Sequence, residues 1–358
     1  MLEIDLETKT LYAELLSRMQ ALHAFRPVAG LKGSFSINKV AGRDYVYFHH
    51  HAIGGRLVQV YVGALDNTTE RLMREYAEGK TDVRAAREIG WRLAIRIPAG
   101  VDMLTDKLTA RVMRSLAGAG VFRLGGVVVG THAYKAIGMM YGVSWQLDTI
   151  VTSDIASRNV SVAIPMITAD IPTVMDSLNM GFLPVPDMNL QQPSTFFVVR
   201  RDRLRLDVLT PKTTKSYDSV FIPRFGCAAM PLDYLSYLIE SPVQAVLINN
   251  DDPVLINVPQ PARYALHKLI VSQIRNRSNS TKSNKDLHQA HQLLSLIQTI
   301  QPDDIRSAWE NLIARGPKWR KPAEKGMKSM RRLFGKLRVD PREGMPPEEN
   351  RFKREQTG

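Results

Sequence analysis

Cysteine is nearly absent from this chain of 358 residues, which contains only Cys227. A single thiol excludes an intramolecular disulfide and any zinc site built on several thiolates. Long apolar runs are also absent, because no stretch reaches the roughly 18 residues that a bilayer-spanning helix needs. The first residues, MLEIDLETKT, are polar and acidic, unlike a secretory signal. We therefore expect a protein without membrane spans in a reducing cytoplasm.

The overall composition is that of an ordinary globular protein. Hydrophobic residues make up 44% of the chain and charged residues 23%, which excludes a fully disordered chain. At roughly 100–200 residues per domain, the length allows about two domains and additional segments.

Positive charge is the first informative excess. Lys and Arg number 48 against 35 Asp and Glu, a formal net charge of +13. Residues 316–358 contain 13 Lys/Arg and 6 Asp/Glu, so this segment alone carries +7. Such a balance favours polyanionic partners, RNA or other nucleic acid among them, bound through the basic surface and the tail. Because residues 316–358 are also rich in Pro and Gly, we predict a disordered tail, apart from a short basic helix over 327–337 on a polyanion.

Hydrophobic periodicity divides the chain into four regions. Residues 1–100 predict a helix, a three-stranded meander and a second helix. Residues 101–260 alternate short strands with helices, which predicts a mixed sheet. Residues 261–315 show helical periodicity, and 316–358 form the tail. The predicted fold class is therefore α+β. The predicted strands of the meander are Ser34–Lys39, Asp44–His49 and Leu57–Val62.

A strand-to-helix turn at Gly130-Thr131 is the first candidate for a binding site. The apolar segment Val127–Val129 leads into this turn, and a helix follows from about His132. Such a turn points backbone N–H groups and a helix N-terminus toward an anion. Many α/β proteins also turn at a glycine for structural reasons alone, so both interpretations stay open.

Two aspartates lie in strand-like apolar segments, Asp154 in VTSDIA and Asp207 in LRLDVLTP. Alternation places Asp207 on the face opposite to Leu204, Leu206 and Val208. A carboxylate in an apolar strand costs free energy unless it is paired or binds a metal. Two such carboxylates on adjacent strands can hold Mg²⁺ against nucleotide phosphates. The alternative is that each aspartate pairs with a nearby arginine, such as Arg158 or Arg205.

Several segments together resemble a known family. They are FRLGG at 122–126, VGTHA at 129–133, TSDI at 152–155, LDVLTP at 206–211, PARYALHKL at 261–269 and KDLHQA at 285–290. In the N-terminal region the pattern Gly42-x-x-Tyr45-x-Tyr47, followed by Gly55-x-x-x-Gln59-x-Tyr61-x-Gly63, matches as well. Over residues 30 to 300 the chain resembles bacterial nucleotidyltransferase-fold proteins of the polymerase β-like superfamily. That family is related in pattern to the nucleotidyltransferase toxins of abortive-infection systems.

The resemblance implies a mixed-sheet nucleotidyltransferase core and a nucleotidyl-transfer reaction. A nucleoside monophosphate would pass from an NTP to an acceptor hydroxyl on RNA or protein, with Mg²⁺ or Mn²⁺ as cofactor. Asp154 and Asp207 would hold the metal and serve catalysis. Nucleotide binding would fall to Gly130, Thr131, Lys268 and Lys285.

Helical phase places Lys268 on one side of its helix together with Tyr264 and Arg275, so a lysine there could reach a triphosphate. Lys285-Asp286 offers a helix–helix ion pair instead.

The sequence departs from the family pattern at one position. The family implies an Asp-x-Asp pair of which Asp154 matches the first aspartate, but residue 156 is Ala156. Two-metal phosphoryl transfer uses several carboxylates to bridge its cations, so this loss weakens the case for catalysis. The alternative is a catalytically degenerate scaffold that binds nucleic acid or a partner protein. A third interpretation is the partner-binding component of a toxin–antitoxin or defence pair.

Overall fold

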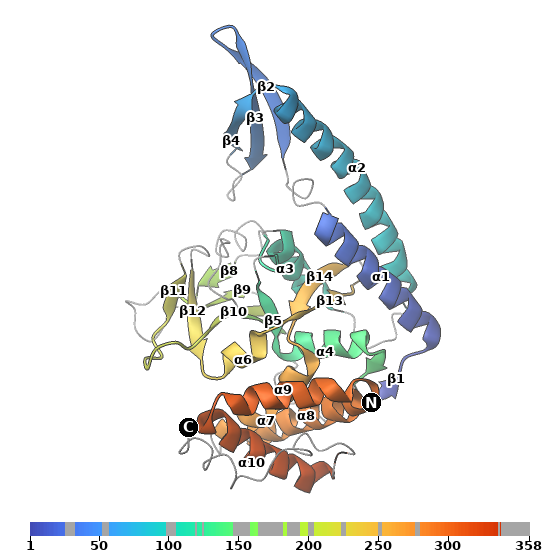
Figure 1. Cartoon of the computed structure of the whole chain (residues 1–358), viewed down its shortest axis with the longest axis vertical. Coiled ribbons are helices and arrows are strands. Elements are labelled where there is room, and N and C mark those ends of the chain that lie inside the picture. The colour runs from blue at the N-terminus through green and yellow to red at the C-terminus, as the bar shows by residue number, and fades with distance from the viewer. Residues whose placement is uncertain are drawn as a thin grey trace, which may run out of the picture. The chain divides into compact units, whose positions relative to one another are not determined.

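A computed structural model describes most of the chain (Figure 1). The described residues are 1–25, 33–51, 57–97, 105–118, 120–123, 125–145, 158–163, 182–184, 194–199, 204–222, 227–249, 253–275, 280–335 and 337. The chain divides into two compact units, Met1–Val258 and Pro259–Gly358, and each is described by itself. Within the described residues, none of the helices is both long enough and apolar enough to cross a membrane.

A seven-stranded mixed sheet forms the centre of the first unit. Its strands are β5 (Val127–Val129), β7 (Arg158–Ala163), β8 (Phe182–Pro184), β9 (Phe196–Val199), β10 (Leu204–Pro211), β11 (Val220–Ile222) and β12 (Cys227–Leu232). The main path runs β11-β12-β10-β7-β5, and β9 joins β8 to β10. β10 is parallel to β7 and β12 but antiparallel to β9. This confirms the predicted α+β class with a mixed sheet.

The side chains of β10 alternate between two environments. Leu204, Leu206 and Val208 are almost completely buried, whereas Arg205 and Asp207 between them are only partly buried. A strand places successive side chains on opposite faces, so one face of β10 joins the core and the other carries the charged residues. This is the alternation that the sequence predicted.

Helices and a hairpin pack around this sheet. They are α3 (Lys107–Gly118), α4 (Gly130–Met140), α6 (Leu235–Ile239), β13 (Val243–Leu247) and β14 (Val254–Val258). β13 and β14 form an antiparallel hairpin, and β14 contacts both α3 and β5. The Trp145 indole stacks on Tyr134 of α4 with 4.6 Å between ring centroids and donates a hydrogen bond to the Tyr134 carbonyl. Both aromatic rings are buried, so they anchor α4 in the core.

The N-terminal region contains the predicted meander between two helices. Its elements are β1 (Leu2–Glu3), α1 (Leu6–Phe25), β2 (Ser34–Val40), β3 (Arg43–His51), β4 (Leu57–Ala64) and α2 (Asn67–Arg96), and β1 pairs with β6 (Val143–Ser144). The rings of Phe35, Phe48 and Tyr76 contact one another edge to face, with centroids 5.0 to 5.6 Å apart, and join the meander to α2. Asp66 caps α2 by accepting hydrogen bonds from the N–H groups of Thr68 and Thr69.

The second unit consists of four helices in the described residues. They are α7 (Pro261–Ile274), α8 (Ser280–Ile300), α9 (Pro302–Ala314) and α10 (Pro317–Phe334). All four contact one another and bury a shared apolar core that includes Leu269, Leu293, Trp309 and Met327. Pro261, Pro302 and Pro317 each open their helix in the first turn, where a missing N–H costs nothing.

The prediction of a disordered tail from residue 316 is wrong for residues 317–326, and the short basic helix expected over 327–337 is the last part of a longer helix. Residues 317–334 form α10, which buries Ala323, Gly326, Met327 and Met330. These residues recur three and four positions apart, which places them on one helical face. The basic composition made this apolar stripe hard to recognise in the sequence. Burial of the stripe supplies the free energy that orders the helix. Residues 338–358 lie outside the described part of the chain.

Gly326 lets α10 approach the backbone of α7 closely. A Cβ atom at this position would lie 2.3 Å from the Leu269 carbonyl oxygen and 2.8 Å from its carbonyl carbon. Because backbone cannot rotate away, Gly326→Ala should force the two helices apart and lower the free energy of unfolding by about 1–3 kcal/mol. Denaturant titration measures this.

Gly118→Ala is the control, because no described atom lies within 4 Å of a Cβ built there. It should leave stability within about 0.5 kcal/mol of wild type or raise it slightly. Equal stability of Gly326→Ala and wild type would contradict the close packing of α10 on α7.

Candidate functional site

The turn between β5 and α4 has the geometry that the sequence predicted. Val127 and Val128 are fully buried, and the chain turns at Gly130 with φ of +72°. That left-handed conformation is strained for any residue with a Cβ. Val129 occupies the N-cap of α4 and has no side-chain oxygen to cap the helix. The first N–H groups of α4, including that of Thr131, therefore point out of the helix without a side-chain cap from this residue.

Asn257 of β14 holds the loop that leads into this turn. Its side-chain amide donates hydrogen bonds to the carbonyl oxygens of Phe122 at 2.6 Å and Gly126 at 2.9 Å. A Cβ on Gly126 would lie 2.8 Å from the Val121 carbonyl oxygen, so the loop is tightly folded. The position of the Gly130 turn is thus fixed by both the sheet and the hairpin.

Strand register connects this turn to Asp207. Val129 of β5 pairs with Ser161 of β7, and Ser161 pairs with Asp207 of β10. Strands lie about 4.8 Å apart, so the Cα atoms of Val129 and Asp207 are separated by two spacings, about 10 Å. Residues paired in register share a face of the sheet. The sheet therefore brings the candidate phosphate turn and one candidate carboxylate to the same region.

Asp207 forms an ion pair with Arg205, two residues earlier on the same face. The distance between Arg205 Nε and Asp207 Oδ1 is 2.6 Å, and the Arg205 guanidinium lies 3.9 Å from the centre of the Phe196 ring. This is the arginine pairing that the sequence offered as an alternative to metal binding. The Asp207 side chain remains 19% exposed, so a cation can still approach it.

Asp154 and Ala156 lie outside the described residues. Ser161, rather than Asp154, is the register partner of Asp207, and Asp154 lies seven positions before Ser161 in the sequence. A fully extended chain would place Asp154 about 23 Å from Ser161 along the strand direction. A shared metal site consequently requires the chain before Arg158 to turn back toward β10. Among the described residues, no group of three or more His, Cys, Asp and Glu side chains has the spacing of a metal site.

His132 and Asp106 are polar residues near the turn that sequence reasoning did not select. Burial, with a smaller contribution from Lys135, lowers the pKa of His132 to about 4, and the nearby Asp106 carboxylate acts in the opposite direction. His132 is therefore neutral at pH 7 and can exchange hydrogen bonds with a ligand without adding charge. Its place in the matched segment VGTHA was the signal that could have identified it.

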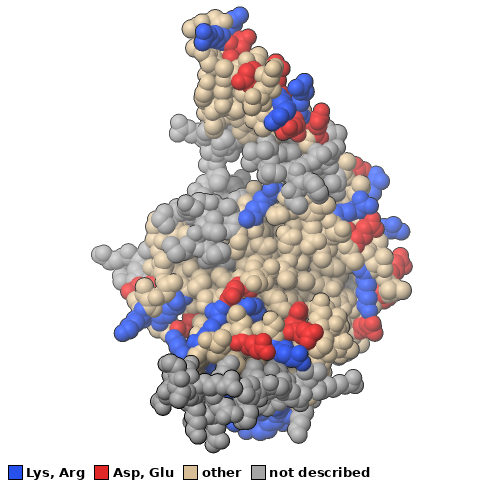
Figure 2. Space-filling model, viewed as in Figure 1, with Lys and Arg blue, Asp and Glu red and all other residues tan. Residues whose placement is uncertain are grey.

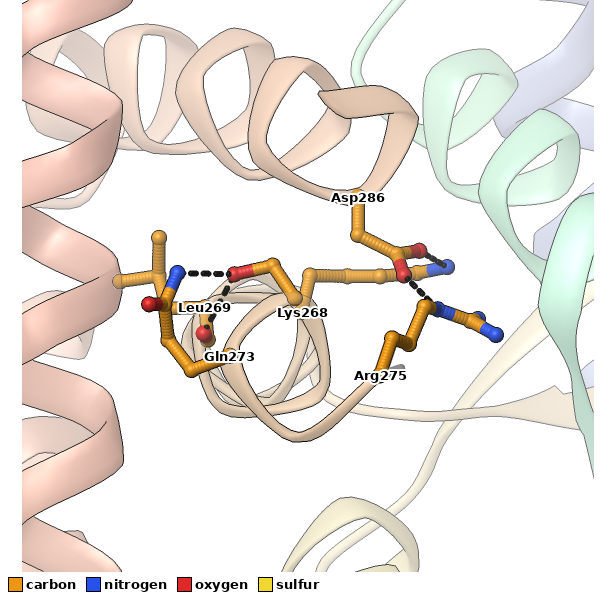
Figure 3. A network of polar contacts seen from close by, with 6 residues as sticks. Lys268, Leu269, Gln273, Arg275 and Asp286 are labelled. Atoms are coloured by element: carbon orange, nitrogen blue, oxygen red, sulfur yellow. Dashed lines mark hydrogen bonds and ion pairs between the residues drawn. The ribbon is translucent and has the colours of Figure 1, made fainter. Parts of the chain in front are cut away.

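The second unit contains a buried ion cluster around Asp286 of α8 (Figure 3). Lys268 Nζ lies 2.7 Å from Asp286 Oδ1, and Arg275 Nε lies 2.7 Å from Oδ2. The Asp286 side chain is 2% exposed. The sequence placed Lys268 and Arg275 on one side of their helix and offered Lys285-Asp286 for a helix–helix ion pair. In the structure Lys268 pairs with Asp286 across the two helices.

Charge in this cluster is unequal, because two cations share one carboxylate. Burial alone would lower the pKa of Lys268, but the attraction and hydrogen bond of Asp286, together with Tyr264, outweigh burial and raise that pKa. For Asp286, burial acts to raise the pKa, and the two cations together lower it. All three groups are charged near neutral pH, so the cluster retains one surplus positive charge. Lys285, which directly precedes Asp286 in α8, is partly buried.

Comparison with known proteins identifies the family. A family model described as Nucleotidyltransferase matches residues 107–314, more than half of the chain. The chain belongs to this nucleotidyltransferase family. All six predicted site residues of the nucleotidyltransferase lie within the matched segment. Membership supports nucleotidyl transfer in general and implies an NTP substrate.

The search of curated proteins finds no match to this nucleotidyltransferase. Among solved structures, an antigenic nucleotidyltransferase-like protein from Paracoccidioides brasiliensis is similar at 14% sequence identity. The similarity covers 62% of this chain and 94% of that one, with a TM-score of 0.32.

Lys268→Met tests how far the Asp286 cluster stabilises the fold. Removing one of two cations from a buried carboxylate leaves its charge partly uncompensated, and we expect a loss of about 3 kcal/mol in the free energy of unfolding. Arg306→Met is the control, because Arg306 is 56% exposed and pairs with the exposed Asp303. It should cost at most about 1 kcal/mol. Equal losses in urea titrations would contradict a structural role for Lys268.

His267, next to Lys268, makes stability depend on pH. Burial lowers the pKa of His267 from 6.5 to about 3, with a further contribution from Lys268. The unfolded chain takes up this proton near pH 6.5 and the folded protein only near pH 3. The stability from neutral His267 is therefore present above pH 6.5 and is lost as the pH falls toward 3.

The free energy of unfolding should fall less steeply in His267→Gln than in wild type as the pH decreases from 6.5 toward 3. The difference in slope should be up to about 1.4 kcal/mol per pH unit. Urea titrations of wild type and variant at several pH values between 7 and 4 measure it. Parallel curves for the two proteins would show that His267 titrates normally in the folded state.

Proposed function

We propose that the protein is a Mg²⁺-dependent nucleotidyltransferase that transfers a nucleoside monophosphate from an NTP to an acceptor hydroxyl on RNA or protein. The observation that carries this proposal is the family match, because it spans Gly130, Thr131, Asp154 and Asp207 as well as both candidate lysines. The single cysteine suits a reducing cytoplasm, where we place the activity.

The residues present fit a hard divalent cation. Carboxylate oxygens are the ligands that Mg²⁺ prefers, and Mn²⁺ accepts the same set. Asp207 offers such oxygens from the partly exposed face of β10, and Asp154 would supply the second carboxylate. Bound Mg²⁺ would neutralise triphosphate charge and lower the pKa of the acceptor hydroxyl.

The chain's own residues then have separate tasks. An oxygen–phosphorus bond forms between the acceptor hydroxyl and the α-phosphorus while the bond to the departing pyrophosphate breaks. Asp154 or Asp207 takes the hydroxyl proton. The N–H groups at Gly130 and Thr131 hold phosphate oxygens, since the start of α4 attracts an anion. Catalysis of this type depends mostly on positioning and charge stabilisation.

Lys268 and Lys285 remain predictions for phosphate contact. The surplus positive charge around Asp286 supports this role for Lys268, because an anion would balance it. Arg275, which is 33% exposed, contributes to the same charge.

Ala156 favours a second candidate function. A site with two carboxylates instead of three binds divalent cations less strongly. The alternative is therefore a degenerate member of the family that keeps the scaffold and binds nucleic acid or a partner protein without transfer.

Asp154→Asn and Asp207→Asn test the proposed activity. Each protein is incubated with Mg²⁺, the four NTPs labelled at the α-phosphate, and either total RNA or total protein as acceptor. We expect each variant to reduce label transfer by roughly 100-fold or more, because one metal ligand is lost. Asp303→Asn, a change at an exposed carboxylate, should leave transfer unchanged. Transfer unaffected by both site variants would rule out this assignment.

Ala156→Asp separates the active from the degenerate interpretation. Residues 154 and 156 would share a face if their segment is extended, so the substitution should strengthen Mg²⁺ binding. Isothermal titration of Mg²⁺ and NTP into wild type and variant measures it, and wild type should bind NTP more readily than it transfers nucleotide. Rapid transfer by wild type with no effect of Ala156→Asp would mean that another carboxylate completes the site.

A further inference from the structure

Exposed cations form a straight line along α10. Lys321, Lys325, Lys328 and Arg332 are all exposed, and they follow one another at intervals of four, three and four residues. This spacing places them on one face of a helix. We call these four residues the basic stripe. In Figure 2, Lys and Arg side chains are visible at the lower end of the molecule, where Figure 1 shows α10.

The opposite face of α10 fixes the stripe in place. Ala323, Met327 and Met330 on that face are completely buried, and Gly326 lies against the backbone of Leu269. The basic stripe is thus held on an ordered helix whose packing does not use its cations. Because α10 lies beyond the residues that the family model matches, family membership does not explain its charge.

The charge of the stripe is not cancelled locally. α10 contains seven Lys/Arg but a single acidic residue, Glu324, whose carboxylate pairs with Arg320 at 2.8 Å. In the part of the chain that the structure describes, none of the four stripe cations forms an ion pair. Helix α2 differs, because its Arg71 and Arg92 each pair with a glutamate one turn away.

The length and chemistry of the stripe fit a phosphate backbone. From Lys321 to Arg332 the helix rises about 17 Å, at 1.5 Å per residue, with one cation at nearly every turn. Nucleic-acid duplexes present a regular line of phosphates, and cations that meet them gain free energy from counterion release. Contacts of this kind position a protein on a duplex without reading its sequence.

Two other partners suit the stripe less well. A basic helix binds membranes by inserting its apolar face, but the apolar face of α10 is already buried against α7. Single-stranded nucleic acid is usually held by exposed aromatic rings, and the stripe has none. The aromatic rings of α10 are engaged, with Trp319 5.1 Å from the Arg315 guanidinium and Phe334 stacked on His288 and His291.

We propose that the basic stripe of α10 is a docking surface for the phosphate backbone of a nucleic-acid duplex. The surface attracts RNA and DNA duplexes alike, because its lysines and arginine meet phosphates and no base edges. Docking depends on these four side chains and is independent of nucleotidyl transfer, so it can be measured without any enzymatic activity.

The test compares two quadruple variants of the full chain. The stripe variant is K321Q/K325Q/K328Q/R332Q, and the control is R71Q/R74Q/R84Q/R92Q, which removes four exposed cations from α2. Fluorescence anisotropy follows binding to a labelled duplex of about 20 base pairs, of arbitrary sequence, between roughly 50 and 200 mM KCl. Both variants lose the same net charge, so the comparison isolates where that charge lies.

We expect the stripe variant to lower the slope of log affinity against log salt by about 3 to 4. The control should keep nearly the wild-type slope. Over this salt range wild type then loses about 100-fold more affinity than the stripe variant does. The melting temperature should stay within a few degrees, since the four side chains are exposed. If the quadruple variant unfolds, K321Q/K328Q provides the same test with half the change in slope.

Three results would overturn the proposal. The first is an equal loss of slope in the two variants, which would make net charge the cause. The second is tighter binding to a single strand than to the duplex. The third is that wild type binds phosphatidylserine vesicles but not duplexes, and that the stripe variant loses this vesicle binding. That result would assign α10 to a membrane surface.

Discussion

The first unit depends on the pairing of β10 with three other strands. β7 lies along one edge of β10, while β9 and β12 divide the other edge between them. Because the side chains of a strand alternate, this pairing can bury Leu204, Leu206 and Val208 only if Asp207 lies on the opposite face. A slip of one residue would bury that carboxylate and expose the leucines. The strand pairing that forms the core therefore also fixes the position of Asp207, the candidate metal ligand.

Local patterns were predictable from the sequence, whereas long-range register was not. The meander, the hairpin β13–β14 and the alternation of β10 follow from side-chain periodicity within each segment. The pairing of Ser161 with Asp207 could not be derived, because strand periodicity leaves the choice of partner and register open. The same limit applies to Lys268. Helical phase identified its neighbours on α7, but Asp286, 18 residues later, becomes its partner only through helix packing.

The surroundings of Asp286 show why structural and binding roles are hard to separate. One buried carboxylate with two cations stabilises the contact between α7 and α8, but the residual positive charge also attracts an anion. Neither role excludes the other, because Lys268 and Arg275 stay partly exposed while Asp286 does not. A lysine that is already oriented by a carboxylate loses less side-chain entropy when it meets a phosphate than a mobile surface lysine does.

The entropy cost of binding also depends on the order of the basic C-terminal region. In a disordered tail, each cation would lose backbone and side-chain entropy on binding a polyanion, which would offset much of the attraction. On α10 the backbone entropy is lost during folding and is compensated there by the burial of Met327 and Met330. Most of the net positive charge of the C-terminal region lies on this ordered helix, since the six Lys/Arg of residues 335–358 are nearly balanced by five Asp/Glu. The cations that favour a polyanionic partner are therefore positioned before any partner arrives.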